Sequence, residues 1–375
     1  MAGIYVHVPF CRKICGYCDF YRTTKVEMIG RYIDALLIET EIRKGYLEGE
    51  QVATVYFGGG TPSLLDHTML QSVLKALTDN NNIAPDAEIT IEVNPDDITP
   101  EYLVGLRKSG FNRISMGVQS WSDKTLKFLN RRHDALQAHN AVHLAVAAGF
   151  SDISIDLIYG LPGLTNEEWE EDLDKTFALP VTHLSAYHLT IEEGTPFGKM
   201  KKQGIISEAD EEDSGTQFNV LIDKANKAGF IHYEISNFGK EGFFSKHNTS
   251  YWKQVPYLGL GPSAHSFNGY SRQWNVSDVS QYITSLMKKK LLFESEDLDQ
   301  RTRLNEYILT SLRTMWGIDL GYVEKVFEKE GYDYITNLSG KFITYGLMRR
   351  ENNSLILTNQ GIMIADNIIA EFIMA

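Results

Sequence analysis

The three cysteines of this 375-residue chain all lie within eight consecutive positions. Cys11, Cys15 and Cys18 stand in the run "PFCRKICGYCDF", separated by three and then two residues. Scattered independently, three cysteines would share so short a window only about once in a thousand chains, so a common ligand is the natural inference. Three thiolates suit three irons of a 4Fe-4S cube, and because the chain has no fourth cysteine, one iron stays open to an outside ligand.

The same cysteine spacing is compatible with a zinc site completed by His7 or a carboxylate, and also with a set of unrelated buried thiols. Closed structural zinc sites usually combine CxxC with a second, distant pair, which this chain lacks. The cysteine pattern therefore favours an iron-sulfur cluster.

A glycine run, "YFGGGTPS", follows an apolar segment. On its own it is typical of a tight turn between a strand and a helix. Beside a cluster loop, Gly58, Gly59 and Gly60 would let backbone groups approach a small ligand closely, and Thr61 adds a hydroxyl. A ligand that carries an amine and a carboxylate would fit there.

Several charged and polar residues follow other apolar runs. Asp156 could bind ribose hydroxyls, and Arg131 could pair with a carboxylate in a fork, although each is more often an ordinary surface charge. Glu92 and Gln119 also lie where apolar runs end. If these runs are strands of one parallel sheet, all these groups gather at one rim.

The elements that must position these groups follow from an alternation of strand and helix patterns. Six apolar, β-branched runs are expected as strands: 3–9, 54–60, 88–95, 113–120, 152–160 and 183–192. Helical patterns fill most of the gaps, which implies parallel pairing with right-handed crossovers. Six units are too few for a closed eight-stranded barrel, so we expect an α/β fold with an open, partial barrel.

Composition excludes some classes of protein. A hydrophobic content of 43% supports large cores, and the net charge of −13 argues against nonspecific binding to nucleic acid. An odd cysteine count favours a reducing compartment, and we see no signal peptide and no run of 18 apolar residues. We expect a cytoplasmic protein, with peripheral membrane contact and a homodimer left open.

CxxxCxxC after the first strand, with the aromatic Tyr17, and the GGGTP loop after the second resemble the radical S-adenosylmethionine superfamily, whose core is a (βα)6 partial barrel. The strings "IYVHVPFC", "YFGGGTPS", "IEVNP", "RISMGVQS", "NRRH" and "IDLIYGLPG" resemble its oxygen-independent coproporphyrinogen III oxidase group, HemN and its relatives, over essentially the whole chain. This resemblance implies that the open iron takes the amino and carboxylate groups of S-adenosylmethionine. It places the contacts with that cosubstrate on Tyr5, Tyr17, Gly59, Gly60, Thr61, Glu92, Gln119, Arg131 and Asp156.

The chain departs from the HemN pattern in three places. Phe20 stands where the HemN loop CxxxCxxCxC has its last cysteine, and the long N-terminal extension of HemN, one wall of its porphyrinogen site, has no counterpart. The segment 233–267 resembles instead the HemW branch, with the motif HNxxY at His247, Asn248 and Tyr251. HemW proteins are haem chaperones that bind haem and deliver it to haem-dependent proteins.

A haem site at His247 has some support from the residues themselves. Imidazole is a standard axial ligand for haem iron, and the aromatic residues around His247 could cover a flat macrocycle. The alternative is a hydrogen-bonded histidine in an aromatic core under a long loop. His265 is a second, less favoured candidate ligand.

Three regions are expected along the chain: a radical S-adenosylmethionine core at 1–235, a connecting region at 236–295 and a winged-helix-like domain at 296–375. The last shows two amphipathic helices, a hairpin turning at Asn352 and Asn353, and a closing helix. Because the chain is acidic, we expect this domain to dock a protein or act as a lid rather than to bind DNA.

Two functions remain open. In the first, the protein is a haem chaperone with haem as its cargo and haem-accepting proteins as partners, and its cluster or S-adenosylmethionine regulates dimerisation or haem transfer. In the second, it is an enzyme that cleaves S-adenosylmethionine and oxidatively decarboxylates the propionates of coproporphyrinogen III. Phe20 and the missing extension favour the chaperone.

Overall fold

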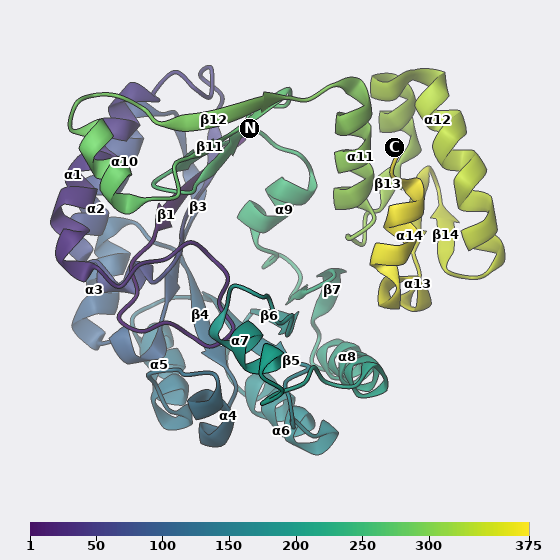
Figure 1. The fold of residues 1–375 in the computed structure, drawn as a ribbon, viewed down its shortest axis with the longest axis horizontal. Coiled ribbons are helices and arrows are strands. Elements are labelled where there is room, and N and C mark those ends of the chain that lie inside the picture. The colour runs from purple at the N-terminus through teal and green to yellow at the C-terminus, as the bar shows by residue number, and fades with distance from the viewer. Residues whose placement is uncertain (375) are drawn as a thin grey trace.

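The computed structural model describes residues 1–374 and shows a curved sheet covered by helices on its outer side (Figure 1). Six parallel strands pair in chain order: β1 (Ala2–Val8), β2 (Val52–Gly59), β3 (Ile83–Val93), β4 (Arg113–Gln119), β5 (Asp152–Tyr159) and β6 (His183–His188). The expected open barrel of six strand-helix units is therefore confirmed. The sixth strand ends at His188, four residues earlier than the apolar run predicts.

Helices connect these strands. They are α1 (Ile29–Ile42), α2 (His67–Asn80), α3 (Pro100–Ser109), α4 (Asp123–Phe128), α5 (Ala135–Ala147), α6 (Asn166–Phe177), α7 (Pro196–Lys202) and α8 (Glu211–Lys227). Local sequence sets their ends: the Thr165 side chain caps α6 and forms a capping box with Glu168. Gly110 ends α3 in the left-handed region, at a φ of 105°. Three short 3-10 turns lie at Val26–Met28, Pro62–Leu64 and Pro95–Asp97.

The sheet continues past both edges of the six-stranded core. Beyond β6 lie β8 (Asn237–Gly239) and β7 (Ile231–Glu234), both antiparallel to their neighbours. Beyond β1 lies β9 (Tyr257–Leu260), which is parallel to β1. The antiparallel strands β10 (His265–Phe267), β11 (Ser271–Asn275) and β12 (Phe293–Asp297) follow it. We call β9 to β12 the sheet extension.

Residues 236–295, which the sequence indicated only as a connecting region, thus supply strands to both edges of the main sheet. They also contribute α9 (Lys246–Trp252) and α10 (Val279–Leu286). Most buried hydrophobic residues from Ala2 to Leu286 form one core, because helices and sheet pack face to face. A smaller, separate cluster contains Leu129, Ile158 and Phe197.

A second hydrophobic core runs from Leu304 to Phe372 in the C-terminal part. It contains α11 (Gln300–Ser311), α12 (Leu320–Thr344), α13 (Asn359–Met363), α14 (Ala365–Phe372) and the strands β13 (Ile318–Asp319), β14 (Met348–Glu351) and β15 (Ser354–Leu357). The hairpin between β14 and β15 turns at Asn352, whose φ is 51°, so the predicted winged-helix outline is present.

The element α12 consists of two helical segments, because the backbone at Glu328 is non-helical, with a φ of 59° and a ψ of −172°. Among residues 1–374, no helix combines the length and the apolar character needed to cross a bilayer.

Candidate functional site

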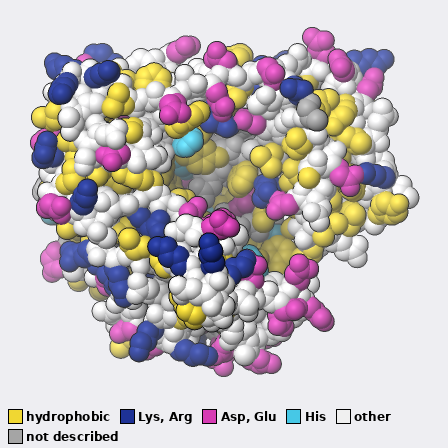
Figure 2. Space-filling model, in the orientation of Figure 1, with side chains coloured by type: hydrophobic (Ala, Val, Ile, Leu, Met, Phe, Trp, Pro, Cys, Tyr) yellow, Lys and Arg dark blue, Asp and Glu magenta, His cyan; other side chains and the backbone are white. Residues whose placement is uncertain are grey.

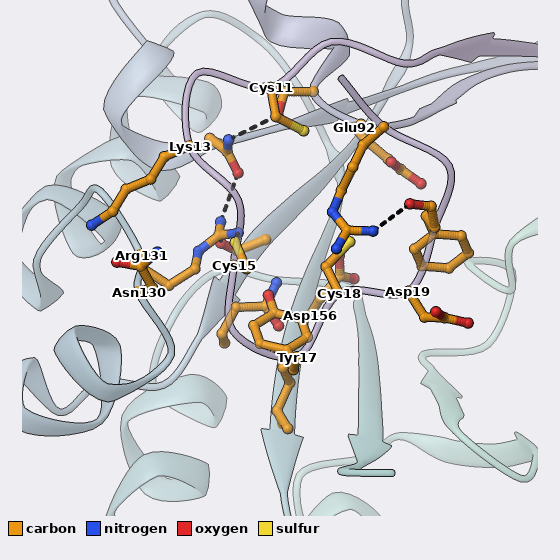
Figure 3. A pocket seen from close by; sticks show the side chains of 18 of the residues that line it. Cys11, Lys13, Cys15, Tyr17, Cys18, Asp19, Glu92, Asn130, Arg131 and Asp156 are labelled. Carbon is orange, nitrogen blue, oxygen red and sulfur yellow. Dashed lines mark hydrogen bonds between the residues drawn. The ribbon is translucent and has the colours of Figure 1, made fainter. Parts of the chain in front are cut away.

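A cavity of about 490 Å³ opens at the carboxyl ends of the parallel strands. All three cysteines line it, and so does every predicted contact of S-adenosylmethionine except Tyr5: Tyr17, Gly59, Gly60, Thr61, Glu92, Gln119, Arg131 and Asp156. Figure 3 shows that Cys11, Cys15, Tyr17 and Cys18 come from one loop, whereas Glu92 and Asp156 come from strands. The topology therefore brings residues that are far apart in the sequence to one rim, as expected for an open parallel sheet.

The cysteine loop is held to the protein on two sides. The Gly16 N–H donates to the Leu129 carbonyl at 3.1 Å, and the Phe197 N–H donates to the Gly16 carbonyl at 2.9 Å. The side chain of Asn130 donates to the Ile14 carbonyl at 2.6 Å. A Cβ atom on Gly16 would lie 2.3 Å from the Phe197 ring, so only glycine allows this approach. The spacing of the cysteines is thereby fixed by tertiary contacts.

Each of two cysteine sulfurs accepts a hydrogen bond. The Thr61 hydroxyl donates to Sγ of Cys11 at 3.5 Å, and the Arg131 guanidinium donates to Sγ of Cys15 at 3.5 Å. All three cysteines are free thiols, and burial raises the pKa of Cys11 and of Cys18. A raised pKa means that forming the thiolate costs free energy, and an iron-sulfur cube would offset this cost by binding the thiolates directly.

The zinc alternative uses His7 or a carboxylate as a further ligand. Within the described part of the chain, no three His, Cys, Asp or Glu side chains form a group that could hold a metal ion. His7 is also engaged elsewhere, since its ring nitrogens lie 3.0 Å from the Tyr5 hydroxyl and 3.0 Å from the Tyr21 carbonyl.

The glycine loop touches the cysteine loop backbone to backbone. A Cβ atom on Gly60 would lie 2.8 Å from the carbonyl oxygens of Phe10 and Val8, and Gly59 has a φ of 106°. The Gly59 N–H donates to Oε2 of Glu92 at 3.1 Å. Side chains here would separate the two loops, which accounts physically for the glycine run.

Two carboxyl groups stand in the cavity wall with raised pKa values. Burial, and then the charge of Asp156, raises the pKa of Glu92 to about 7, although the Tyr56 hydroxyl donates to Oε1 of Glu92 at 2.9 Å. Burial raises the pKa of Asp156 to about 6, against hydrogen bonds from Ser185 and Ser115. Such buried acceptors suit amine and hydroxyl donors of a ligand.

Arg131 and Gln119 complete the rim. Besides Cys15, the guanidinium of Arg131 donates to Oδ1 of Asn94 and to the Gly117 carbonyl, both at 2.6 Å. The register of β4 against β5 shifts between Gly117 and Gln119, and Gln119 has a φ of 71°. Strained backbone of this kind re-aims a side chain and clusters at functional sites.

Comparison with known proteins places these features in a family. A family model for the Radical SAM superfamily matches residues 5–176. The chain is 34% identical to the protein named Heme chaperone HemW of Lactococcus lactis subsp. lactis (strain IL1403), over 99% of this chain and 97% of that one. It is 30% identical to the protein of the same name from Bacillus subtilis (strain 168), over 100% of this chain and 99% of that one. This chain belongs to the HemW family of the radical SAM superfamily.

One solved structure similar to this HemW family member is coproporphyrinogen III oxidase (HemN) from Escherichia coli, a radical SAM enzyme, with a TM-score of 0.86 and 25% identity. The match covers 99% of this chain and 90% of that one. Membership of the superfamily implies a 4Fe-4S cluster and S-adenosylmethionine. The donor set fits both, because three free thiols without a fourth line the same cavity as the ligand-binding groups.

Tyr5 is not among the residues that line the cavity, so its contact with S-adenosylmethionine stays a prediction. It lies three residues before the end of β1, and its hydroxyl is bonded to His7. Its ring stacks on Tyr56, with centroids 6.2 Å apart. In this structure the Tyr5 side chain contacts His7 and Tyr56.

The HemW motif residue His247 is not open to an iron atom in this structure. Its side chain is 2% exposed, Nδ1 lies 2.8 Å from the Thr54 hydroxyl and Nε2 lies 2.9 Å from the Tyr251 hydroxyl. The Asn248 N–H donates to the Ser245 hydroxyl, which caps the start of α9. Axial ligation by His247 therefore stays a prediction that requires Tyr251 to move first.

The cavity also contains residues that the sequence did not single out. These are Lys13, Arg22, Asp96, Asn130, Arg132, Ile158, Tyr187, His188, Thr190 and Glu192, among others. Most follow the carboxyl ends of strands, and that position is the one signal that could have found them. Their residue types are ordinary for a protein surface, so no spacing pattern marked them.

Proposed function

We propose that this protein is a haem chaperone that holds a 4Fe-4S cluster on Cys11, Cys15 and Cys18, binds S-adenosylmethionine and transfers haem to haem-dependent proteins. One observation carries the proposal: this chain is similar to proteins named heme chaperones over nearly the whole length of both sequences. The free thiols of all three cysteines support action in the reducing cytoplasm.

Each rim residue has a role in this proposal. Arg131 and Thr61 stabilise the thiolate form of Cys15 and Cys11 through the contacts described above. The backbone of Gly59 and Gly60 leaves room for the cosubstrate, and Glu92 and Asp156 accept hydrogen bonds from its amine and hydroxyl groups. The open iron would take the amino and carboxylate groups of S-adenosylmethionine.

A second candidate is oxygen-independent coproporphyrinogen III oxidation, which the structural similarity to HemN favours. Phe20 weighs against it. This residue stands where the HemN loop has a further cysteine, and its side chain is 69% exposed at the cavity mouth. An exposed phenyl ring offers a flat surface for a macrocycle but no thiolate.

The test compares both functions in one preparation of the full chain, reconstituted with iron and sulfide under anaerobic conditions. We expect it to bind haem and to pass that haem to an apo haem protein, followed by the recipient's absorption spectrum. We also expect no conversion of coproporphyrinogen III to protoporphyrinogen IX when S-adenosylmethionine and a reductant are present. Conversion of coproporphyrinogen III would replace this proposal by the enzymatic one, and failure to bind haem would refute the chaperone function.

A further inference from the structure

We propose that the haem cargo binds on the concave face of the sheet extension, with His265 as the axial ligand of its iron. This inference rests on the proposed function, because it names the site of the same cargo. The face is formed by β9, β10 and β11 and lies opposite the C-terminal helix α11.

His265 offers an open imidazole. It is exposed at the start of β10, and its side chain makes no hydrogen bond with any residue from 1 to 374 that the structure describes. Burial and then the positive charge of Arg272 lower its pKa, so the ring is neutral at physiological pH. A neutral imidazole without a competing partner is the form that binds iron.

Aromatic side chains continue the face on both sides of His265. Trp274 pairs with His265 across β10 and β11, and the two rings stack with centroids 5.9 Å apart at 27°. Phe267 lies two residues further along β10 and hence on the same face as His265. Its ring packs on Tyr257, with the ring centroids 6.3 Å apart. One histidine is thus surrounded by flat apolar groups, as a porphyrin plane requires.

A groove of about 300 Å³ borders this face. It is lined by Tyr251, Gln254, Val255, Tyr257, Phe267, Arg272, Glu306 and Thr310. Figure 2 shows a hollow between the sheet and the C-terminal helices, with hydrophobic side chains on both of its sides. A porphyrin edge would enter this groove while its iron faces His265.

Charge at the groove suits an anionic macrocycle. Arg272 is the cation of the groove, and it bonds to Glu306 at 2.6 Å and lies 3.6 Å from Glu296. A haem propionate can replace one of these carboxylates on the guanidinium. The C-terminal helix α11, which supplies Glu306, would then sense the presence of cargo.

His247 competes poorly for the same haem. It lies behind Tyr251, with both ring nitrogens engaged, whereas Tyr251 itself lines the groove. Haem binding at His247 would break two buried hydrogen bonds. Haem binding at His265 would break no side-chain hydrogen bond to any residue that the structure describes.

The test is haem titration of the full chain, followed by the Soret band, for the wild type and the variants His265→Ala, His247→Ala and His139→Ala. His139 is an exposed histidine on α5 and serves as the matched control. We expect His265→Ala to bind haem at least about tenfold more weakly with a shifted Soret band, and the control to match the wild type. Added imidazole should restore the wild-type band position in His265→Ala, because it occupies the vacated axial site.

Two outcomes would overturn the inference in distinguishable ways. If the wild type binds haem and His265→Ala binds it with the same affinity and spectrum, the location on the sheet extension is wrong and the chaperone proposal stands. If His247→Ala alone shifts the band, His247 is the ligand. If the wild type binds no haem, both this inference and the proposed function fail. Because His265 is exposed, its replacement leaves the core intact, and unchanged circular dichroism would verify this.

Discussion

The guanidinium of Arg131 lies 3.5 Å from Sγ of Cys15, although 116 residues separate them in the sequence. The same side chain holds Asn94 and the Gly117 carbonyl, so it joins the cysteine loop to the ends of two strands. A cation in this position stabilises a thiolate ligand, and it does so from the scaffold rather than from the loop itself.

We therefore expect Arg131→Gln to weaken the retention of the cluster. Without the cation, iron should be lost to a chelator several times faster than from the wild type under anaerobic conditions. Arg132→Gln is the matched control, because Arg132 also lines the cavity but pairs with Asp96 and Asp97. Equal rates of iron loss for both variants would show that Arg131 acts only as a general surface charge.

Gly16→Ala should displace the cysteine loop. The added Cβ atom would meet the Phe197 ring, which is 2% exposed and packs on Phe128 with ring centroids 4.7 Å apart, so neither side can yield. Overpacking of this kind costs about 1 to 3 kcal/mol. We expect less than half of the wild-type iron and sulfide per chain after reconstitution.

The control for Gly16→Ala is Gly30→Ala, because no described atom lies within 4 Å of a Cβ built on Gly30. Gly30 lies inside α1, where alanine is the better helix former, so this variant should keep its cluster and melt no earlier. Full cluster occupancy in Gly16→Ala would contradict the geometric argument.

The sequence predicted those parts of the site that depend on local pattern. The cysteine spacing, the glycine run and the polar residues at strand ends identified most of the cavity, because parallel strands carry their carboxyl ends to one rim. It did not predict the sheet extension, since β9 joins β1 only through pairing between residues 3–6 and 257–260. Short strands of three to five residues depend on such distant partners more than on their own composition.

The sequence could not predict the burial of His247, because this burial also depends on partners that are distant in the sequence. Its partners are Thr54 on β2 and Tyr251 one helical turn away, and Glu88 on β3 accepts the His247 N–H at 3.1 Å. A histidine among aromatic residues has the same local pattern whether it faces a ligand or a core. Only the fold separates these two environments.

Asp156→Asn should weaken the binding of S-adenosylmethionine to the reconstituted protein. Losing a charge-assisted acceptor costs roughly 1.5 to 3 kcal/mol, a loss of affinity of about ten-fold or more, to be measured by calorimetry. Since its pKa is about 6, wild-type affinity should rise between pH 5 and pH 7, and this rise should shrink in the variant. Glu193→Gln, at an exposed position beside the cavity residue Glu192, should bind as the wild type does. Unchanged affinity in Asp156→Asn would remove Asp156 from the site.

Glu92 gives the final prediction, which concerns stability and pH in the chain without S-adenosylmethionine. Its pKa is about 7 in the folded chain, against an ordinary value of 4.5, because burial disfavours the charged form. Between these two values the folded state binds a proton that the unfolded state has released. The contribution of Glu92 to the free energy of unfolding is therefore fully present below pH 4.5 and is lost as the pH rises through 7.

Glu92→Gln is neutral at every pH, so it should remove this contribution. We expect the fall in the free energy of unfolding between pH 5 and pH 8 to be smaller in the variant by about 2 kcal/mol, measured by urea denaturation. The amide oxygen of Gln can accept from the Tyr56 hydroxyl or from the Gly59 N–H, but its NH2 group cannot accept from the other donor. The comparison therefore uses the change of the free energy of unfolding with pH in each protein, because the loss of one hydrogen bond lowers the variant's stability at every pH. Glu193→Gln provides the baseline, because its side chain is exposed. Parallel profiles for wild type and Glu92→Gln would mean that Glu92 is ionised in the folded chain at all these pH values, with its charge stabilised by groups other than the two donors named here.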